Sequence, residues 1–203
     1  MQVKNRQKTD IANPAQDPAI TAVMERYAVS LTDHVLSAMQ SPDTVADPVA
    51  RQYLPAADEL VNTPEELDDP IGDEAHSPVK GIVHRYPDRV LLKPVHVCAV
   101  YCRFCFRREK VGPGSEALSA DELAAAIDYI KNAPQVWEVI LTGGDPFVLS
   151  ARRLQGIMAA LNDIPHVQVI RFHTRVPVAD PVRMTDEVIA ALESDKAVYV
   201  VLH

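Results

Sequence analysis

The three cysteines of this 203-residue chain, Cys98, Cys102 and Cys105, fall within eight residues. Cysteine thiolates are the usual ligands of iron–sulfur clusters. Three of them can hold three corners of a cubane cluster and leave the fourth iron free for a small molecule, whereas a fourth protein ligand would close that position. The spacing therefore predicts a four-iron, four-sulfur (4Fe–4S) cluster that takes part in chemistry.

Other uses of clustered cysteines stay open from the residues alone. A structural zinc site usually takes ligand pairs from separate turns, and the sequence offers no second Cys or His pair at a suitable spacing. A disulfide framework favours an even number of cysteines in a small secreted chain. A zinc or redox site, inert buried thiols and a non-catalytic iron–sulfur protein are the remaining alternatives.

The cysteines match the Cys-x3-Cys-x2-Cys signature of radical S-adenosylmethionine (SAM) enzymes. The wider sequence, from about residue 69 onward, resembles the lysine 2,3-aminomutase family, which includes an enzyme that isomerises lysine before its attachment to elongation factor P. Four blocks carry the resemblance in the family's order: 84–92 (His-Arg-Tyr-Pro-Asp-Arg-Val-Leu-Leu), 102–108 (Cys-Arg-Phe-Cys-Phe-Arg-Arg), 141–146 (Leu-Thr-Gly-Gly-Asp-Pro) and 171–177 (Arg-Phe-His-Thr-Arg-Val-Pro).

The resemblance implies an isomerase that shifts an amino group from C2 to C3 of L-lysine or a related amino acid. Its implied cofactors are the 4Fe–4S cluster, SAM and pyridoxal 5′-phosphate (PLP), with a flavodoxin or ferredoxin as electron donor and a possible homo-oligomer. In the family, the lysine that carries PLP lies beyond the place where this sequence ends. A radical SAM enzyme that acts on another substrate without PLP is therefore the second hypothesis.

Several residues can be assigned to SAM by their match to the family. Phe104 is implied beside the adenine, with plain core packing as the alternative. Gly143 and Gly144 allow a tight bend at a strand end and close approach to a ligand, and the family's motif meets the amino group of SAM there. Asp145 is suited to accept a charge-assisted hydrogen bond from that ammonium, or else to cap the next helix.

The arginines of the matching blocks suggest anion binding, because a guanidinium pairs well with carboxylates and phosphates. Arg107 directly follows the cysteines, and the resemblance implies that it holds the substrate carboxylate. Arg171, His173 and Arg175 are implied near SAM, with salt bridges inside a barrel as the alternative. Three residues are implied at the phosphate of PLP: Arg85, Tyr86 and Arg89.

The elements that must position these residues follow a strand–helix alternation from residue 89. Strands separated by helices predict an α/β fold with a parallel sheet, and the resemblance specifies a partial (β/α)6 radical SAM barrel. The site motifs follow strand ends, where parallel sheets bind ligands. Four of six expected strands leave an open edge, so we expect a C-terminally incomplete sequence. Strands are predicted over 90–97, 136–142, 167–174 and 197–202, and helices after Ser119, after Ser150 and over 185–192.

The remaining sequence predicts a helical, proline-rich N-terminal extension over 1–80, before a core over 81–203. An apolar face recurs at helical spacing over 17–39, and frequent prolines then interrupt long elements. The chain is 47% hydrophobic with a net charge of −8, which disfavours a nucleic-acid partner. No apolar run approaches the length of a membrane span. We therefore expect a cytoplasmic protein whose partner is a small amino acid substrate.

Overall fold

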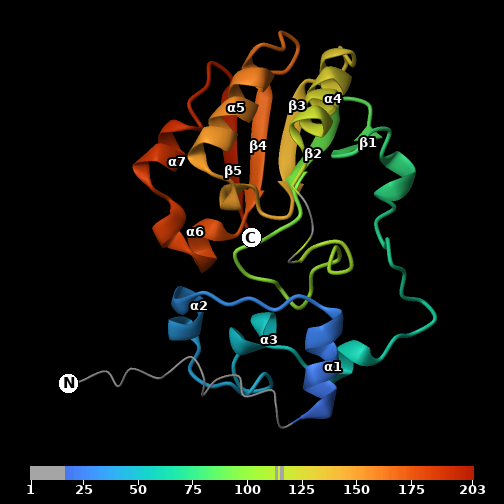
Figure 1. Ribbon diagram of the computed structural model, residues 1–203, viewed down its shortest axis with the longest axis vertical. Coiled ribbons are helices and arrows are strands. Elements are labelled where there is room, and N and C mark those ends of the chain that lie inside the picture. The colour runs from blue at the N-terminus through green and yellow to red at the C-terminus, as the bar shows by residue number, and fades with distance from the viewer. Residues whose placement is uncertain (1–16, 113, 115–116) are drawn as a thin grey trace.

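The structure is a computed structural model that describes residues 17–112, 114 and 117–203. The first part of the predicted extension, residues 1–16, lies outside the described residues. A layer of short N-terminal helices lies below a sheet, and the loop that carries the cysteines lies between the two (Figure 1).

The sheet has five strands in the order β1-β2-β3-β4-β5. Its last four strands are parallel, and one aligned row runs across them through Val90, Val139, Ile170 and Val198. This confirms the predicted α/β class and the open, partial barrel. The strands are β1 (Ile82–Tyr86), β2 (Arg89–Val95), β3 (Glu138–Gly143), β4 (Val169–Thr174) and β5 (Ala197–Leu202).

Strand β1 was not predicted from the sequence. It pairs antiparallel with β2, and Tyr86 lies opposite Arg89 across the turn that contains Pro87. Only Ile82 and Val83 of this strand are buried, so its apolar pattern is too short to stand out. The first family-like block is therefore a hairpin at the edge of the sheet.

Helices α4 (Ala120–Lys131) and α5 (Ala151–Asn162) cover one face of the sheet (Figure 1). Both begin at the predicted caps. Ser119 and Glu122 form a capping box, and the hydroxyl of Ser150 accepts a hydrogen bond from the amide of Arg153. The short elements after β3 and β4 are η4 (Pro146–Val148), α6 (Val176–Ala179), η5 (Pro181–Arg183) and α7 (Asp186–Ala190).

The apolar face over 17–39 does not form one helix. The backbone becomes extended at Tyr27, and a new helix begins after Thr32, whose hydroxyl accepts a hydrogen bond from the amide of Val35. Each short helix buries its own apolar residues. The N-terminal elements are α1 (Pro18–Arg26), α2 (Asp33–Ala38), α3 (Ala50–Tyr53) and η2 (Ala57–Leu60).

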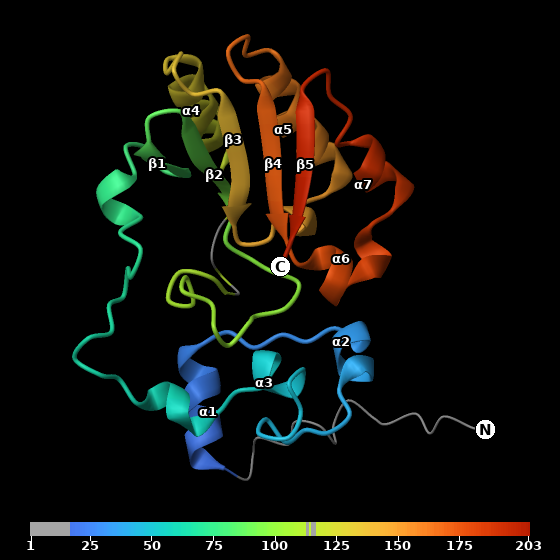
Figure 2. The same ribbon diagram turned by 180° about the vertical axis from the view of Figure 1, so that it is seen from behind.

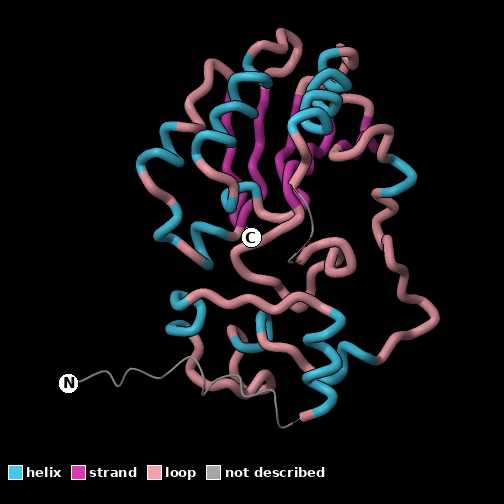
Figure 3. Tube along the Cα trace, viewed as in Figure 1, coloured by secondary structure: helices cyan, strands magenta, loops and turns pink. Residues whose placement is uncertain are grey.

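Residues 61–80 connect the N-terminal layer to β1 along one side of the molecule. The segment is mostly loop, with one short helix η3 (Glu74–His76), as Figure 3 shows. No helix in the described part of the chain is both long enough and apolar enough to cross a bilayer.

Seen from behind, the strands lie in front and α4 and α5 lie behind them (Figure 2). Strand alternation places Arg89, Glu138 and Arg171 on one face. The buried Glu138 carboxylate pairs with Arg89 at 3.2 Å and with Arg171 at 2.6 Å. For Arg171, the salt-bridge alternative is thus the one that the structure shows.

Candidate functional site

The cysteine loop is attached to the N-terminal layer through its backbone. The amide of Arg103 donates to the carbonyl of Gln52 at 2.8 Å, and the amide of Tyr101 donates to the carbonyl of Ser30 at 3.4 Å. The hydroxyl of Ser30 in turn donates to the carbonyl of Ala99. Because the first two bonds join main-chain groups, they fix the path of the loop whatever its side chains are.

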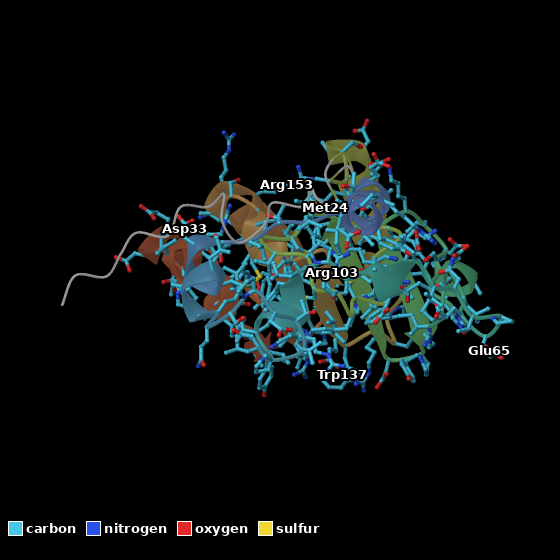
Figure 4. The ribbon with its side chains drawn as sticks, turned by 90° about the horizontal axis from the view of Figure 1, so that it is seen from below. Met24, Asp33, Glu65, Arg103, Trp137 and Arg153 are labelled. Atoms are coloured by element: carbon cyan, nitrogen blue, oxygen red, sulfur yellow. The ribbon has the colours of Figure 1, made fainter. Side chains whose placement is uncertain are left out.

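An ion pair between Arg103 and Glu59 reinforces this attachment. The guanidinium donates to both carboxylate oxygens, at 3.0 and 2.6 Å, and also to the carbonyl of Ala28 at 2.9 Å. The two side chains are only 9% and 10% exposed. Arg103 lies near the centre of the molecule seen from below, whereas Glu65 lies at its edge (Figure 4). Nothing in the sequence pattern pointed to Glu59.

All three cysteines line one cavity of about 190 Å³ at the carboxyl ends of the strands. Cys98, Cys102 and Cys105 are partly buried free thiols. The cavity therefore brings together most of the residues predicted at the cluster and at SAM. Its other predicted lining residues are Phe104, Gly143, Gly144, Asp145, His173 and Arg175.

The arrangement of the thiols is compatible with a cluster. Among the described residues, no group of three His, Cys, Asp or Glu side chains converges as it would on a single metal ion. A cubane cluster does not need such a focus, because each thiolate binds a different iron. The shared cavity and the sulfur ligands thus fit a 4Fe–4S cluster better than a structural zinc ion, which requires one tetrahedral centre.

Burial favours the protonated form of two of the free thiols, Cys98 and Cys102. It raises the pKa of Cys98 to about 12, and the Asp145 carboxylate acts in the same direction. Burial also raises the pKa of Cys102, although the nearby guanidinium of Arg175 opposes this shift. The metal-free thiols of Cys98 and Cys102 are therefore protonated and unreactive at neutral pH, and iron must displace their protons.

The glycines after β3 permit a very close approach of two backbones. Gly143 has φ +104°, which favours glycine. A Cβ at Gly144 would lie 2.4 Å from the carbonyl oxygen of Val97, just before the first cysteine. The amides of Gly144 and Asp145 donate to the carbonyls of Val95 and Val97. Gly144 is thus required by packing against the strand that leads to the cluster loop.

Asp145 is buried, and its carboxylate accepts four hydrogen bonds from the protein. Oδ1 accepts from the amide of Phe147 and the hydroxyl of Thr174, while Oδ2 accepts from the amides of Arg175 and Val176. The capping alternative therefore describes this side chain, which ties the end of β3 to the end of β4.

Arg175 connects the cavity to the N-terminal layer. Its guanidinium donates to the hydroxyl of Tyr53 at 3.1 Å and to Oε1 of Gln52 at 3.3 Å. The same group lies 5.2 Å from the ring centroid of Phe104. Phe104 is 60% exposed, so it belongs to the cavity wall and not to the core. Tyr53 and Gln52 carry no sequence signal, since their relation to Arg175 arises only in the tertiary structure.

His173 lies near the carboxyl end of β4, beside His203. Its ring is 5.3 Å from the ring of His203, in an edge-to-face arrangement. Burial lowers the pKa of His173, and the charges of His203 and Arg171 lower it further. The imidazole is therefore neutral at pH 7 and available as a hydrogen-bonding group in the cavity.

Arg107 lines a different cavity, of about 160 Å³. Its guanidinium donates to the carboxylate of Asp73 at 3.0 and 2.9 Å, and it stacks over the ring of Phe106 at 4.4 Å. Phe106 lines both this cavity and the cysteine cavity. Arg107 is thus near the cysteines and already holds a carboxylate, here one of the protein's own.

The residues assigned to the PLP phosphate, Arg85, Tyr86 and Arg89, line a third cavity, of about 130 Å³. The structure brings the three together, but two of the charges are engaged. Arg89 pairs with Asp88 at 2.9 Å and with Glu138, while Arg85 lies 4.0 Å from Asp73. Tyr86 is 59% exposed on the edge strand.

Comparison with known proteins gives a consistent set of relatives. L-lysine 2,3-aminomutase of Clostridium subterminale is 37% identical over 188 residues, which cover 93% of this chain and 45% of the relative. The enzyme of the same name from Acetoanaerobium sticklandii is 38% identical over 94% of this chain and 46% of its own length. Glutamate 2,3-aminomutase of Clostridioides difficile is 34% identical over 91% of this chain and 43% of its own length.

The chain thus spans a little under half the length of these curated relatives. Residues 92–202, which contain the three cysteines and strands β3 to β5, match the Radical SAM superfamily. This match covers more than half of the chain and coincides with the cysteine cavity. The chain belongs to the radical SAM superfamily.

Proposed function

We propose that the protein is an aminomutase that moves an amino group from C2 to C3 of L-lysine or a closely related amino acid. The observation that carries the proposal is the gathering of Cys98, Cys102 and Cys105 around one cavity at the carboxyl ends of parallel strands. Its lysine- and glutamate-aminomutase relatives support the choice of reaction.

The chain's own residues divide the work of such a site. Cys98, Cys102 and Cys105 would hold the 4Fe–4S cluster, which when bound supplies the electron that splits a carbon–sulfur bond of SAM. Gly143 and Gly144 let the end of β3 pack against residues 95–97, and both line the cavity, where they are the proposed neighbours of the amino group of SAM. The chemistry belongs to the cofactors, and the protein contributes position and exclusion of water.

The cavity wall provides groups suited to SAM. His173 offers a neutral imidazole, and Arg175 offers a guanidinium held in place by Tyr53. Phe104 presents an exposed ring on which an adenine could stack. Asp145 contributes by holding the two strand ends together, since its carboxylate already accepts four hydrogen bonds.

Arg107 is the proposed ligand of the substrate carboxylate, and Arg85, Tyr86 and Arg89 are the proposed ligands of the PLP phosphate. A flavodoxin or ferredoxin as reductant, a cytoplasmic location and a homo-oligomer belong to the same proposal. PLP, when bound, supplies an aldehyde that takes up the migrating nitrogen.

One observation favours the second candidate, a radical SAM enzyme without PLP. Arg89 is paired with two carboxylates and Arg85 lies beside a third, so a phosphate would have to compete with these partners. The two candidates differ in an optical property, because PLP bound to a protein lysine absorbs visible light and SAM does not.

The test is anaerobic reconstitution of the full-length protein with iron and sulfide. With SAM, PLP, a reductant and L-lysine, β-lysine should form, and L-glutamate in a parallel reaction shows the substrate preference. A Cys102→Ala variant is the control that should lose both cluster and activity. Cleavage of SAM without any rearranged amino acid would refute the mutase and favour the second candidate.

A further inference from the structure

Arg175 links the end of β4 to the N-terminal helix α3 along the wall of the cysteine cavity. Its amide donates to Oδ2 of Asp145 at 2.7 Å, which fixes its backbone just after the strand. Its guanidinium donates to the hydroxyl of Tyr53 at 3.1 Å and to Oε1 of Gln52 at 3.3 Å. Helix α3 lies on the side of the cysteine loop that faces away from the sheet (Figure 1 and Figure 2). One side chain thus joins the two layers that enclose the cysteines.

Gln52 connects this arginine to the cysteine loop itself. Its backbone carbonyl accepts a hydrogen bond from the amide of Arg103 in the loop, while its side chain accepts from Arg175. The guanidinium also lies 5.2 Å from the ring centroid of Phe104 and 5.9 Å from that of Tyr53. The positive charge of Arg175 is therefore held in a defined place beside the middle of the cysteine loop.

The hydrogen-bond partners of this guanidinium are neutral. In the part of the chain that the structure describes, they are an amide oxygen and a hydroxyl, and no carboxylate lies within ion-pairing distance of the group. Its charge instead acts on the cavity. Burial raises the pKa of Cys102, and Arg175 opposes this shift because a cation stabilises the thiolate.

The carboxylate of Asp145 acts in the opposite direction, but mainly on another cysteine. After burial, Asp145 has the largest effect on the pKa of Cys98, whereas Arg175 has the largest effect on that of Cys102. Cys98 and Cys102 therefore meet charges of opposite sign first. Substitution of Arg175 alone changes the charge beside one predicted cluster ligand and leaves the Asp145 carboxylate in place.

A fixed positive charge beside such a ligand has a direct consequence for a redox centre. A cluster that takes up one electron from its reductant gains one negative charge, and no bond forms or breaks. The potential of an iron–sulfur cluster depends on the charges, hydrogen bonds and solvent exposure around its sulfur atoms. A nearby cation stabilises the reduced form more than the oxidised form, because the attraction grows with the added negative charge.

We propose that Arg175, held in place by Tyr53 and Gln52, raises the reduction potential of the 4Fe–4S cluster. The inference rests on the proposed cluster and deepens it, because it gives the N-terminal helix α3 a part in electron uptake. Tyr53 and Gln52 are positioning residues, which act through the guanidinium.

The experiment is an anaerobic redox titration of the reconstituted full-length protein, without SAM, PLP or substrate. The electron paramagnetic resonance signal of the reduced cluster gives the ratio of reduced to oxidised cluster at each applied potential. In Arg175→Met, we expect this ratio to fall about tenfold at a given potential, which corresponds to about 59 mV for a one-electron couple. Arg175→Lys should recover more than half of this shift, since it keeps the charge but loses the planar fork of donors.

A second variant keeps the charge and removes its support. Gln52→Leu combined with Tyr53→Phe takes away both acceptors of the guanidinium, while the backbone bond from Arg103 to residue 52 stays. We expect the ratio to fall in the same direction but by less than in Arg175→Met, because a released guanidinium is screened by solvent.

The matched control is Arg183→Met, which removes one positive charge from the exposed η5 and should leave the ratio as in wild type. Iron and sulfide contents verify that each variant carries the cluster. A ratio in loaded Arg175→Met within about twofold of wild type, or an equal fall in Arg183→Met, would overturn the inference.

If Arg175→Met assembles no cluster, the double variant decides, and a wild-type ratio in it overturns the inference. The result is separable from the proposed reaction, because no substrate is present. A failed mutase assay leaves the role of Arg175 standing, and an unchanged potential leaves the mutase standing.

Discussion

The sheet region (residues 81–203) and the N-terminal region (residues 17–60) are held together in different ways. The larger cluster of buried apolar side chains belongs wholly to the sheet region and is built from β2, β3, β4, α4 and α5. A second cluster has four buried members, of which Val35 and Tyr53 come from the N-terminal region and Val100 and Ala179 from the sheet region. The sheet region therefore has an apolar core of its own, whereas the second, smaller core is formed jointly by the N-terminal region and the sheet region.

Because the N-terminal region has no large core of its own, polar contacts also attach it to the sheet region. The N-terminal region is fixed by the backbone of the cysteine loop, by the buried Glu59–Arg103 pair and by Tyr53 with Arg175. All of these contacts reach residues of the cysteine cavity or its loop. The candidate site is therefore also the place where the two regions join, so a change in either region should alter the site.

The largest effect is expected from Phe172→Ala, in the core of the sheet region. Phe172 is fully buried against Phe147, with ring centroids 5.2 Å apart. Truncation should lower the free energy of unfolding by about 3–5 kcal/mol and destabilise both regions. Urea denaturation measures the loss, and a change below about 1 kcal/mol would contradict the assignment of the core.

A smaller and local effect is expected from Glu59→Ala. The guanidinium of Arg103 would stay buried without its partner, which costs about 3 kcal/mol. Hydrogen exchange should show faster exchange in α1 and α3 while β3 keeps its protection. Glu65→Ala, at the exposed edge of the molecule, is the matched control (Figure 4). Equal loss of protection in both regions would mean that the sheet has no independent core.

Tyr53→Phe should have a weaker effect, because it removes only the hydroxyl that accepts from Arg175. We expect a loss of about 1 kcal/mol and a less ordered guanidinium beside the cysteine cavity. Limited proteolysis of the N-terminal region reports the change, with Tyr86→Phe on the edge strand as control. If both variants are cleaved at the same rate, Tyr53 does not join the regions.

The smallest effect is expected when the wild-type protein is acidified, and it concerns Asp47. Hydrogen bonds from the amides of Ser41, Ala50, Gln40 and Val49 lower its pKa to about 2. A lowered pKa stabilises the folded state above the unfolded value near 4, and this stabilisation is lost as the pH falls toward 2. The N-terminal region of wild type should therefore loosen between about pH 4 and pH 2.

Asp88 is the carboxylate of the sheet region that corresponds to Asp47, because its pKa is also lowered. Hydrogen bonds from Arg89 and Trp137 lower the pKa of Asp88 to about 2. In hydrogen-exchange measurements at pH 5 and pH 2.5, Asp47→Asn should flatten the pH dependence of α2 and α3 only. A pH dependence of these helices that Asp47→Asn leaves unchanged would assign the acid sensitivity to another group.

The sequence predicted the parallel strands, the caps at Ser119 and Ser150, and the position of the cysteines after a strand. These features are local, since they depend on periodicity and on residues within one turn of a helix. Strand β5 was predicted at Ala197–Leu202, where it lies. The antiparallel β1 was missed because a short edge strand buries too few side chains to leave a pattern.

The contacts that join the two regions could not be predicted in this way. Glu59, Tyr53 and Gln52 lie 44 or more residues from their partners Arg103 and Arg175. Their chemical types are ordinary, and only the tertiary fold places them beside the cysteine loop. The same holds for Asp73, whose carboxylate pairs with three cations from separate segments.

The three partly buried thiols of the loop have a consequence for the stability of the protein in the cell. Only the folded chain gathers Cys98, Cys102 and Cys105 around one cavity, so a bound inorganic cofactor would draw the folding equilibrium toward the native state by mass action. Because both regions contact this loop, cluster binding would stabilise both regions and their attachment to each other. Iron starvation would then reduce the abundance of the polypeptide, through turnover of the unloaded form.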